Sequence, residues 1–424
     1  MDIGLVLFWS SVLLIVYTYL GYPCLLWLWA KIRSRPCRRQ GGEPSVVLII
    51  VAHDEARRMD ARLQNVLSLD YPRHRLEIWL ASDGSTDGTV EQARAYEPAG
   101  VRVIEFQRHR GKPATLSDVI PRANGEIVVL ADARQRFDSG AIRMLVAPFA
   151  DPQVGAVSGE LVLTPDSEGT AVAHGLGCTW RYEKFIRRNE SLVDSSVGVT
   201  GAIYAIRRDL FETLPGDTIL DDVWIPMRIV RRGYRVLFQP SARAYDQAPL
   251  TVEEDFTRKV RTMAGKFQLL ARERWLLSPL RNRLWLQTFS HTVLRALVPL
   301  FIVGALGANL LLLESLLYRW TLGGQILFYG AALAGYSIRS AKKGPPLFSV
   351  PFVFCLVSWA TVVGFFRFVT GRQPVTWEKV SAYGLSQSLR EEVWSPKEPA
   401  PSARRLQPPG HWRRWSGHSR PFQH

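Results

Sequence analysis

Cysteine is scarce in this chain, which excludes the classes of protein that depend on it. The 424 residues include four cysteines, Cys24, Cys37, Cys178 and Cys355. None of them has the short spacing typical of zinc ligands, and two lie in apolar segments. The sequence therefore indicates neither a disulfide framework nor a structural zinc site.

Acidic residues are also few: 38 Asp and Glu stand against 53 Lys and Arg, and the formal net charge is +15. Such a charge is typical of nucleic-acid-binding proteins, but no compact module of basic and aromatic residues is present. A Gly-x-Gly-x-x-Gly turn is missing too, because the first apolar strand runs into His53-Asp54-Glu55. That absence argues against a nicotinamide-binding domain.

Apolar sequence is abundant at both ends of the chain. Leu5 to Ala30 carries no charge and exceeds the ~20 residues that a membrane-spanning helix needs. It is too long for a signal-peptide core, and no convincing cleavage site follows it. A core helix of a soluble protein is the alternative. The basic residues that follow directly predict a cytoplasmic location for this end of the helix; they are Lys31, Arg33, Arg35, Arg38 and Arg39.

Three C-terminal segments are each about long enough to cross a membrane: Thr292–Leu313, Leu316–Ile338 and Leu347–Val369. Their few charges lie near segment ends, which argues against a transporter or channel. One N-terminal and three C-terminal spans would put the basic tail on the outer side. We therefore expect that the first or the last of the three lies in the interface or re-enters the membrane.

Between these ends, short β-rich runs alternate with helical stretches. The predicted strands are Val46–Ala52, Leu76–Ser82, Val101–Glu105, Ile127–Ala131, Val154–Leu163, Val197–Ile206 and Arg235–Gln239. The predicted helices are Arg57–Ser68, Gly88–Tyr96, Pro113–Arg122, Ser139–Phe149 and Asp222–Arg232. The alternation predicts an α/β fold in which a mostly parallel sheet has helices on both faces.

Five regions follow from this pattern. We expect an N-terminal transmembrane helix (1–30), a basic juxtamembrane linker (31–44) and a cytoplasmic α/β domain (45–285). About three membrane segments (286–370) and a basic, partly disordered tail (371–424) complete the chain.

Two predicted strands end in a carboxylate, Asp83 in the run IWLASDGSTDGT and Asp132 in IVVLADAR. In open α/β sheets ligands bind at this end of the strands. A plain Asp-Gly turn is the alternative for Asp83, and a calcium loop fails because Arg94 stands where a glutamate is needed. Asp132 could ligate Mg²⁺ or Mn²⁺ held by a diphosphate.

Three further groups complete the pattern. Glu55, after the first strand, could bind a nucleobase or simply cap a helix. Asp221-Asp222 could cap a helix or supply a general base, since crowded carboxylates raise each other's pKa. Arg258 and Arg261 share a helix face that suits a leaving diphosphate, although a basic face near anionic lipid is the alternative.

In order, the chain reads VAHDEA, SDGSTDGT, RGKPAT, LADAR, GAIYAIRR, LDDVW and RKVRTMAG. Over about Ser45 to Gln268 this order resembles the membrane-integrated family 2 glycosyltransferases, which have a GT-A (Rossmann-like) fold. The resemblance implies an inverting glycosyltransferase of the cell membrane with several spans, a cytoplasmic catalytic domain and Mg²⁺ or Mn²⁺ as cofactor. It implies a nucleotide-diphospho-sugar donor, a UDP-sugar, and a lipid or polysaccharide acceptor in cell-envelope or exopolysaccharide synthesis. A non-catalytic partner subunit of a polysaccharide synthesis complex is the alternative.

The resemblance also implies residue roles. Asp222 matches the catalytic base, with Asp221 in the preceding acidic position, and Asp132 would contact metal. The residues implied to bind the nucleotide-sugar are Ala52, Glu55, Asp83, Lys112, Asp132 and Arg134. Those implied at the diphosphate or acceptor are Arg258, Arg261 and Gly201.

The chain departs from the family's motifs at two places. Arg134 stands where a second metal-binding Asp is expected, so Arg134 itself could offset phosphate charge. Arg258 and Thr262 replace the Gln and Trp of the Gln-x-x-Arg-Trp motif. That Trp lines the acceptor site of processive enzymes, so addition of a single sugar becomes at least as plausible an activity.

Overall fold

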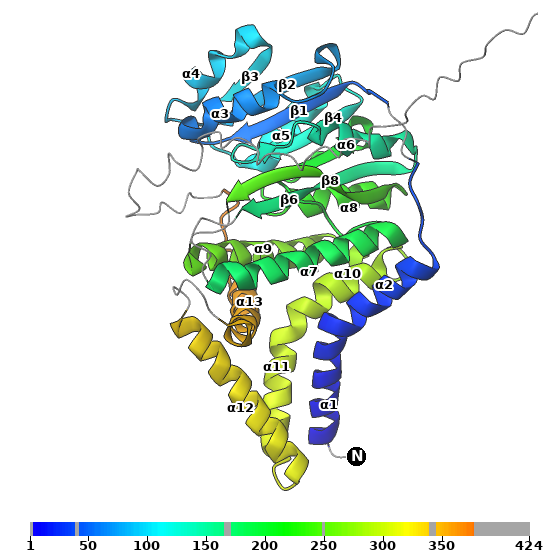
Figure 1. Cartoon of the computed structure of the whole chain (residues 1–424), viewed down its shortest axis with the longest axis vertical. Coiled ribbons are helices and arrows are strands. Elements are labelled where there is room, and N and C mark those ends of the chain that lie inside the picture. Colours follow the sequence, from blue (N-terminus) through cyan, green and yellow to red (C-terminus); the bar gives the residue numbers. More distant parts are fainter. Residues whose placement is uncertain (1–2, 39–41, 165–170, 248–250, 339–344, 377–424) are drawn as a thin grey trace, which may run out of the picture. The chain divides into compact units, whose positions relative to one another are not determined.

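The structure is a computed structural model that describes residues 3–38, 42–164, 171–247, 251–338 and 345–376 (Figure 1). Its eight strands are β1 Val46–Ala52, β2 Leu76–Asp83, β3 Val101–Phe106, β4 Ile127–Asp132, β5 Arg136–Phe137, β6 Val154–Thr164, β7 Ile203–Arg207 and β8 Arg235–Gln247. They form one sheet in the order β3-β2-β1-β4-β7-β6-β8-β5. Parallel pairings join β1 to β2 and β4, β2 to β3, and β6 to β8.

The other pairings are antiparallel, β7 with both β4 and β6, and β5 with β8. The sheet is therefore mixed where the sequence predicts a mostly parallel one. The first four predicted strands are confirmed to within a residue. The predicted strand Val197–Ile206 begins only at Ile203, because 197–202 form a loop that is bonded to neighbouring segments. The two-residue β5 was not predicted.

Helices cover both faces of the sheet, as predicted. These are α3 Ala56–Leu67, α4 Thr89–Arg94, α5 Lys112–Val119, α6 Ala141–Val146 and α8 Asp221–Arg231. Every residue of β1 is buried, and alternate residues enter two separate cores. Leu48 packs on one face with α3 and α6, and Ile49 packs on the other with α5 and α8. Burial of each such side chain contributes about 1.5–3 kcal/mol, so β1 is firmly fixed at the centre of the domain.

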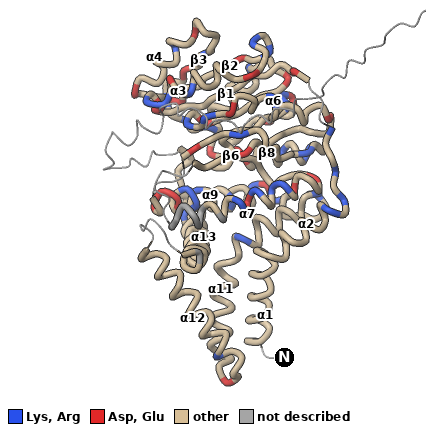
Figure 2. The backbone as a smooth tube through the Cα atoms, in the orientation of Figure 1, with Lys and Arg blue, Asp and Glu red and all other residues tan. Residues whose placement is uncertain are grey.

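Two long helices, α7 Ala171–Val193 and α9 Val252–Arg272, run beneath β6 and β8 (Figure 1). α7 packs on α2 (Tyr22–Ile32) and on α13 (Pro346–Val369), and α9 packs on α13. Basic residues are frequent along both helices (Figure 2). α7 and α9 thus connect the sheet domain to the apolar helices.

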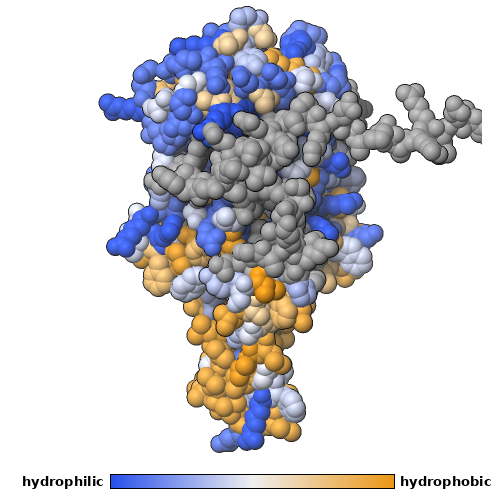
Figure 3. Space-filling view, turned by 60° about the vertical axis from the view of Figure 1, so that its left-hand side comes forward, coloured by the Kyte–Doolittle hydropathy of each residue, from blue (hydrophilic) through white to orange (hydrophobic). Residues whose placement is uncertain are grey.

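The apolar helices are α1 Ile3–Val16, α2, α10 Trp285–Thr288, α11 Leu294–Leu311, α12 Leu316–Ser337 and α13. Single π-helical turns join α1 to α2 and α10 to α11. Among the described residues, three helices are long and apolar enough to cross a membrane: Ile3–Ile32, Trp285–Leu311 and Leu347–Val369. The predicted span over Leu316–Ile338 is not one of them. Figure 3 shows the apolar surface gathered at this end of the molecule.

Candidate functional site

The strands predicted to end at a ligand are neighbours in the sheet, and their carboxyl ends lie side by side. The register pairs Ala52 of β1 with Ser82 of β2, and Val51 of β1 with Asp132 of β4. Asp83 follows Ser82 as the last residue of β2. The carboxyl ends of β1, β2 and β4 therefore bring residues 52, 83 and 132 to the same rim.

Asp83 is fully buried, and the loop after β3 donates hydrogen bonds to both of its carboxylate oxygens. The backbone N–H of Arg110 donates to Oδ1 at 3.0 Å, and that of Gly111 donates to Oδ2 at 2.7 Å. The Nδ1 atom of His109 lies 2.8 Å from Oδ2. The sequence predicts contact between Asp83 and the nucleotide. That contact stays a prediction; the structure shows that Asp83 also holds the loop that leads into Lys112.

The turns after β1 and β2 form one interlocked structure. The backbone N–H of Asp54 donates to Ser85 Oγ at 3.1 Å, and that of Thr86 donates to Asp54 Oδ1 at 2.7 Å. The N–H of Glu55 donates to Thr89 Oγ1 at 2.8 Å. These bonds fix Glu55 at the rim, where the predicted nucleotide contact requires it.

Lys112 is the centre of the site. Its Nζ donates to Asp132 Oδ1 at 2.6 Å and lies 3.6 Å from Asp221 Oδ2. A Cβ atom on Gly201 would lie 3.5 Å from Asp222 Oδ2 and 3.7 Å from Lys112 Nζ. The tertiary structure thus brings together five predicted site residues that lie up to 110 positions apart in the chain.

Buried charges set the protonation of this cluster. Burial alone would lower the pKa of Lys112, but Asp132 and then Asp221 outweigh it and raise that pKa. Burial opposes ionisation of Asp132 in the same way, yet Lys112 and Arg134 leave its pKa below the ordinary value. Lys112 and Asp132 therefore form a charged pair at neutral pH.

Asp222 titrates differently from Asp132. Burial, followed by the negative charge of Asp221, raises the pKa of Asp222 to about 6, although Lys112 and Arg187 act in the opposite direction. A carboxylate with this pKa is ionised at neutral pH and is a stronger base than an ordinary aspartate. Asp222 therefore has the properties of a general base.

Tyr204 is a site residue that the sequence did not predict. It is fully buried on β7, and its hydroxyl has no hydrogen-bond partner among the described residues. Burial, together with Asp221, Asp222 and Asp132, raises its pKa well above the ordinary value. Tyr204 lies in the GAIYAIRR motif, but only the antiparallel pairing of β7 with β4 brings it to the carboxylates.

The predicted diphosphate residues lie beside this cluster. Arg134 Nε pairs with Asp246 Oδ2 at 3.1 Å, and Arg258 forms an ion pair with Glu254. Burial and then Arg134 lower the pKa of Arg258, so the two guanidinium groups lie within electrostatic range of each other. Arg261 instead donates from Nη2 to the Val375 carbonyl at 3.1 Å, while its Nε has no partner among the described residues.

The segment after α13 also reaches this region. A Cβ atom on Gly111 would lie 3.5 Å from Val375 and 3.8 Å from Thr376. Together with the Arg261 contact, this places 375–376 between α9 and the Lys112 loop. The rest of the predicted tail, from residue 377 onward, lies outside the described residues.

Among the residues predicted to bind metal, the site provides one carboxylate, that of Asp132. The described part of the chain holds no cluster of three or more His, Cys, Asp or Glu side chains suited to a metal. Oδ1 of Asp132 is already engaged by Lys112, and Arg134 occupies the second motif position. Mg²⁺ is commonly held by one or two carboxylates, with phosphate and water as further ligands. Asp132 fits that arrangement as a single ligand.

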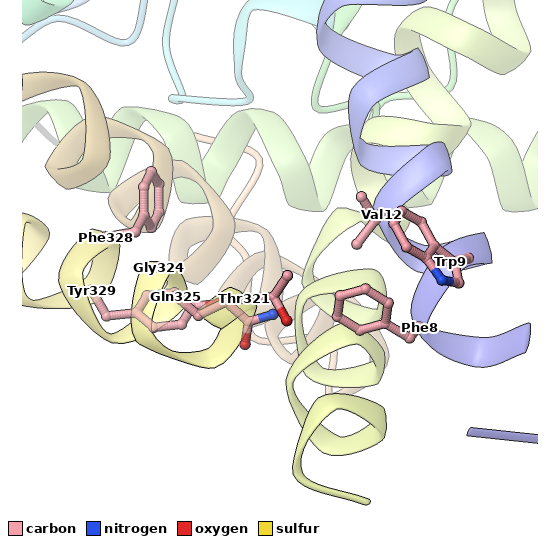
Figure 4. Close-up of a pocket in the computed structure, with 8 residues that line it drawn as sticks. All are labelled: Phe8, Trp9, Val12, Thr321, Gly324, Gln325, Phe328 and Tyr329. Carbon is pink, nitrogen blue, oxygen red and sulfur yellow. The ribbon is translucent and has the colours of Figure 1, made fainter. Parts of the chain in front are cut away.

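A cavity lies elsewhere, among the apolar helices. It has a volume of about 320 Å³ and lies between α1 and α12 (Figure 4). Its lining residues are Phe8, Trp9, Val12, Thr321, Gly324, Gln325, Phe328 and Tyr329. None of the predicted catalytic or donor-binding residues contributes to it.

The part of the chain that forms the sheet domain is similar to known proteins. A family model described as "Glycosyltransferase like family 2" matches residues 44–265, more than half of the chain. The solved mannosyltransferase PcManGT from Pyrobaculum calidifontis, in complex with GDP-Man and Mn²⁺, superposes with a TM-score of 0.66. At 22% identity it covers 86% of this chain and 99% of that one, which supports a shared GT-A fold.

Two curated relatives show how far sequence similarity extends. The poly-β-1,6-N-acetyl-D-glucosamine synthase of Staphylococcus aureus is 25% identical over 239 residues, 54% of this chain and 56% of the relative. The β-monoglucosyldiacylglycerol synthase of Nostoc is 30% identical over 154 residues, 35% of this chain and 33% of the relative. The match thus spans about half the length of the first relative and a third of the second.

Proposed function

The chain belongs to glycosyltransferase-like family 2, and on this premise we propose that it moves a sugar from a UDP-sugar to a membrane-associated lipid or polysaccharide acceptor. The observation that carries the proposal is the Lys112-centred cluster at the sheet rim, in which Asp222 has a pKa of about 6. The three candidate membrane helices support an acceptor in the bilayer.

In the proposed reaction, Asp222 accepts the proton of an acceptor hydroxyl as that oxygen attacks the anomeric carbon. The bond from the anomeric carbon to the diphosphate oxygen breaks, and its electron pair leaves with the nucleoside diphosphate. One displacement inverts the configuration at this carbon. The proton ends on Asp222, and the released diphosphate carries the new negative charge.

Cationic side chains stabilise that developing charge. Lys112 is held by Asp132, and Arg134 by Asp246, so both are positioned before the donor binds. Fixed cations at a developing charge lower the barrier without reorganisation. A divalent ion at Asp132, when bound, would supply further positive charge to the diphosphate.

The acceptor and the location are part of the proposal. Curated relatives include a polymer synthase and a glycolipid synthase, so both acceptor classes occur among similar proteins. Thr262 in place of the motif Trp makes addition of a single sugar at least as plausible as polymerisation. Basic residues after Ile32 favour a multi-pass protein of the cell membrane whose catalytic domain faces the cytoplasm.

The test uses purified full-length protein, radiolabelled nucleotide sugars and a membrane extract. We expect Asp222→Asn to bind UDP like the wild type but to transfer sugar at least ~100-fold more slowly, the usual scale for loss of a general base. Asp60→Asn, a change of an exposed carboxylate on α3, is the matched control and should keep full activity. Full transfer by Asp222→Asn would show that Asp222 is not the general base. If the wild type binds no donor, the proposal that this protein is a glycosyltransferase is contradicted.

A further inference from the structure

Helix α13 has the composition of a membrane span but lies beside a charged helix. Its 24 residues carry a single charged side chain, in the last turn. Val252 at the start of α9 forms an apolar cluster with Phe352 and Val353 of α13. About three turns further along each helix, a Cβ atom on Gly364 would lie 2.8 Å from Met263 Cβ. The two helices therefore run side by side and in the same direction.

Helix α9 is held outside the hydrocarbon layer of a membrane. Its far end packs into the sheet domain, where Leu269 is buried in the same core as Ile49. The first two turns of α9, which lie along α13, are rich in charged side chains: Glu253, Glu254, Asp255, Arg258 and Lys259. Each charge at the centre of a bilayer would cost at least about 2.5–3.5 kcal/mol. A helix that packs along α9 therefore does not run through the bilayer centre.

Helices α11 and α12 form a pair that leaves the sheet domain and returns to it (Figure 1). Just before α11, His291 Nδ1 lies 2.9 Å from Glu190 Oε1 of α7. The chain reverses direction in the short turn between the two helices. The last turns of α12 come back to the start of α13, where Gly335 leaves no room for a Cβ against the Phe348 carbonyl. Both ends of the pair thus lie near the sheet domain.

The chain after α13 also lies on the side of the sheet domain. The Val375 carbonyl accepts a hydrogen bond from Arg261 of α9 at 3.1 Å, and Val375 faces Gly111 in the loop that carries Lys112. The segment from His291 to Val375 therefore begins and ends on one side and crosses a membrane an even number of times. Because α11 and α12 account for two crossings, none remains for α13.

The face of α13 that points away from α9 is apolar and exposed. Tyr336 of α12, which is also exposed, lies beside Phe352 of α13 with ring centroids 6.1 Å apart, so the apolar surface continues from one helix to the other. Such a face beside membrane helices fits the acyl chains of a lipid leaflet. The spacing of its large side chains puts them on one side of the helix; they are Leu347, Val350, Trp359, Phe365, Phe366 and Val369.

We propose that α13 lies flat in the leaflet next to the catalytic domain, with this face among the acyl chains, while α1, α11 and α12 cross the bilayer. Length and composition alone favour α13 over α12 as a span. The packing on α9 reverses that choice, and the 22 residues of α12 are long enough to cross. Acyl chains then begin about 10 Å from α9, the usual distance between packed helices, so α13 sets the level of the membrane below the catalytic cluster.

Single cysteines and a membrane-impermeant maleimide test this topology in cells that produce the full-length chain. The four natural cysteines are first changed to serine. Glu314→Cys, Ser337→Cys and Thr370→Cys then place one exposed thiol at the turn after α11, at the end of α12 and after the end of α13. Asp60→Cys, on the surface of the sheet domain, marks the side on which that domain lies.

Glu314→Cys should react from the side opposite to Asp60→Cys, while Ser337→Cys and Thr370→Cys should react from the same side as Asp60→Cys. Opposite sides for Ser337→Cys and Thr370→Cys would show that α13 crosses the bilayer. The same side for Glu314→Cys and Asp60→Cys would show that α11 does not cross. Either pattern overturns the inference, and neither depends on transfer activity.

The depth of α13 gives a second measurement, made with spin labels on purified full-length protein in lipid nanodiscs. Val350, Trp359 and Phe366 follow its exposed face, and the first and last are about 24 Å apart along the helix axis. Labels at all three should lie at similar depths, about 5–10 Å into the boundary between headgroups and acyl chains. A label at Leu327, exposed in the middle of α12, is the matched control and should lie near the bilayer centre. If Trp359 instead lies at the centre, with Val350 and Phe366 near opposite surfaces, α13 spans the membrane and the inference is wrong.

Discussion

At the scale of single residues, neighbours decide what each carboxylate does. Asp83, Asp132 and Asp222 are all acidic residues at the same edge of one domain. Backbone N–H groups occupy Asp83, Lys112 binds Asp132, and Asp222 lies beside another carboxylate. The first therefore positions a loop, the second stays ionised, and the third is suited to accept a proton.

The raised pKa of Asp222 predicts the pH dependence of transfer. The base acts only when deprotonated, so kcat/KM should fall as pH decreases through about 6. Asp221→Asn removes the negative charge that helps to raise this pKa, so the acid limb should move to lower pH. The measurement is a pH profile of kcat/KM for both proteins. An unchanged or upward-shifted limb in Asp221→Asn would contradict the assignment.

Arg134 should govern how strongly the enzyme depends on metal. Arg134→Asp restores a second carboxylate two residues after Asp132 and removes a cation. We expect UDP binding by this variant to be weak without Mn²⁺ and to recover as Mn²⁺ is added, with a larger Mn²⁺ effect than in the wild type. Isothermal titration with and without Mn²⁺ measures this. Arg136→Asp, an exposed change on β5, is the control and should keep the wild-type Mn²⁺ response.

At the scale of elements, the SDGSTDGT turn holds together the rim of the sheet. It bonds to the turn after β1 through Ser85 and Thr86, and Asp83 binds the loop that carries Lys112. Gly84 has φ +67°, and a Cβ there would lie 2.3 Å from the backbone nitrogen of His109. A side chain at this position would therefore push away the loop that Asp83 holds.

Two glycines of this turn test that packing. Gly84 and Gly88 both have positive φ, but a Cβ on Gly88 would meet no atom within 4 Å. Gly88→Ala should cost about 1–2 kcal/mol from backbone strain alone. Gly84→Ala should cost about 1–3 kcal/mol more, because the loop backbone must move. Thermal unfolding of both variants gives the comparison, and equal losses would show that the loop is not packed against Gly84.

At the scale of the whole molecule, the contact between α9 and α13 connects the site to the candidate membrane helices. Gly364 of α13 lies against α9, where a Cβ would be 2.8 Å from Met263 Cβ and 2.9 Å from the Val260 carbonyl. Small residues permit such close approach of helices. Because α9 carries Arg258 and Arg261, its packing on α13 positions the residues that are predicted to bind the diphosphate or acceptor.

Gly364→Val should therefore lower both thermal stability, by about 1–3 kcal/mol, and transfer activity. Gly323→Val on α12 is the matched control, since a Cβ there would have nothing within 4 Å. Thermal unfolding in neutral detergent and transfer assays on both variants make the measurement. If the two variants behave alike, the α9–α13 contact does not support the site.

Much of the fold was predictable because its signals are local. The strands before residue 133 are short apolar runs that end in polar turn residues, and β1, β2, β3 and β4 appear within a residue of their predicted bounds. The antiparallel direction of β7 leaves no mark in the sequence pattern. For that reason the mixed sheet and the role of Tyr204 could not be predicted.

The sequence by itself determined the α/β domain, its apolar flanks and the order of motifs along the chain, because apolar periodicity and turn residues act over a few positions. Only the tertiary structure decided which charges meet. Lys112 touches Asp132 and approaches Asp221, while Arg295 reaches Glu183 across more than a hundred residues. Such pairings depend on strand register and helix packing. Coulomb interactions over a few ångströms then determine which side chain binds a ligand, which one holds a neighbouring loop and which one accepts a proton.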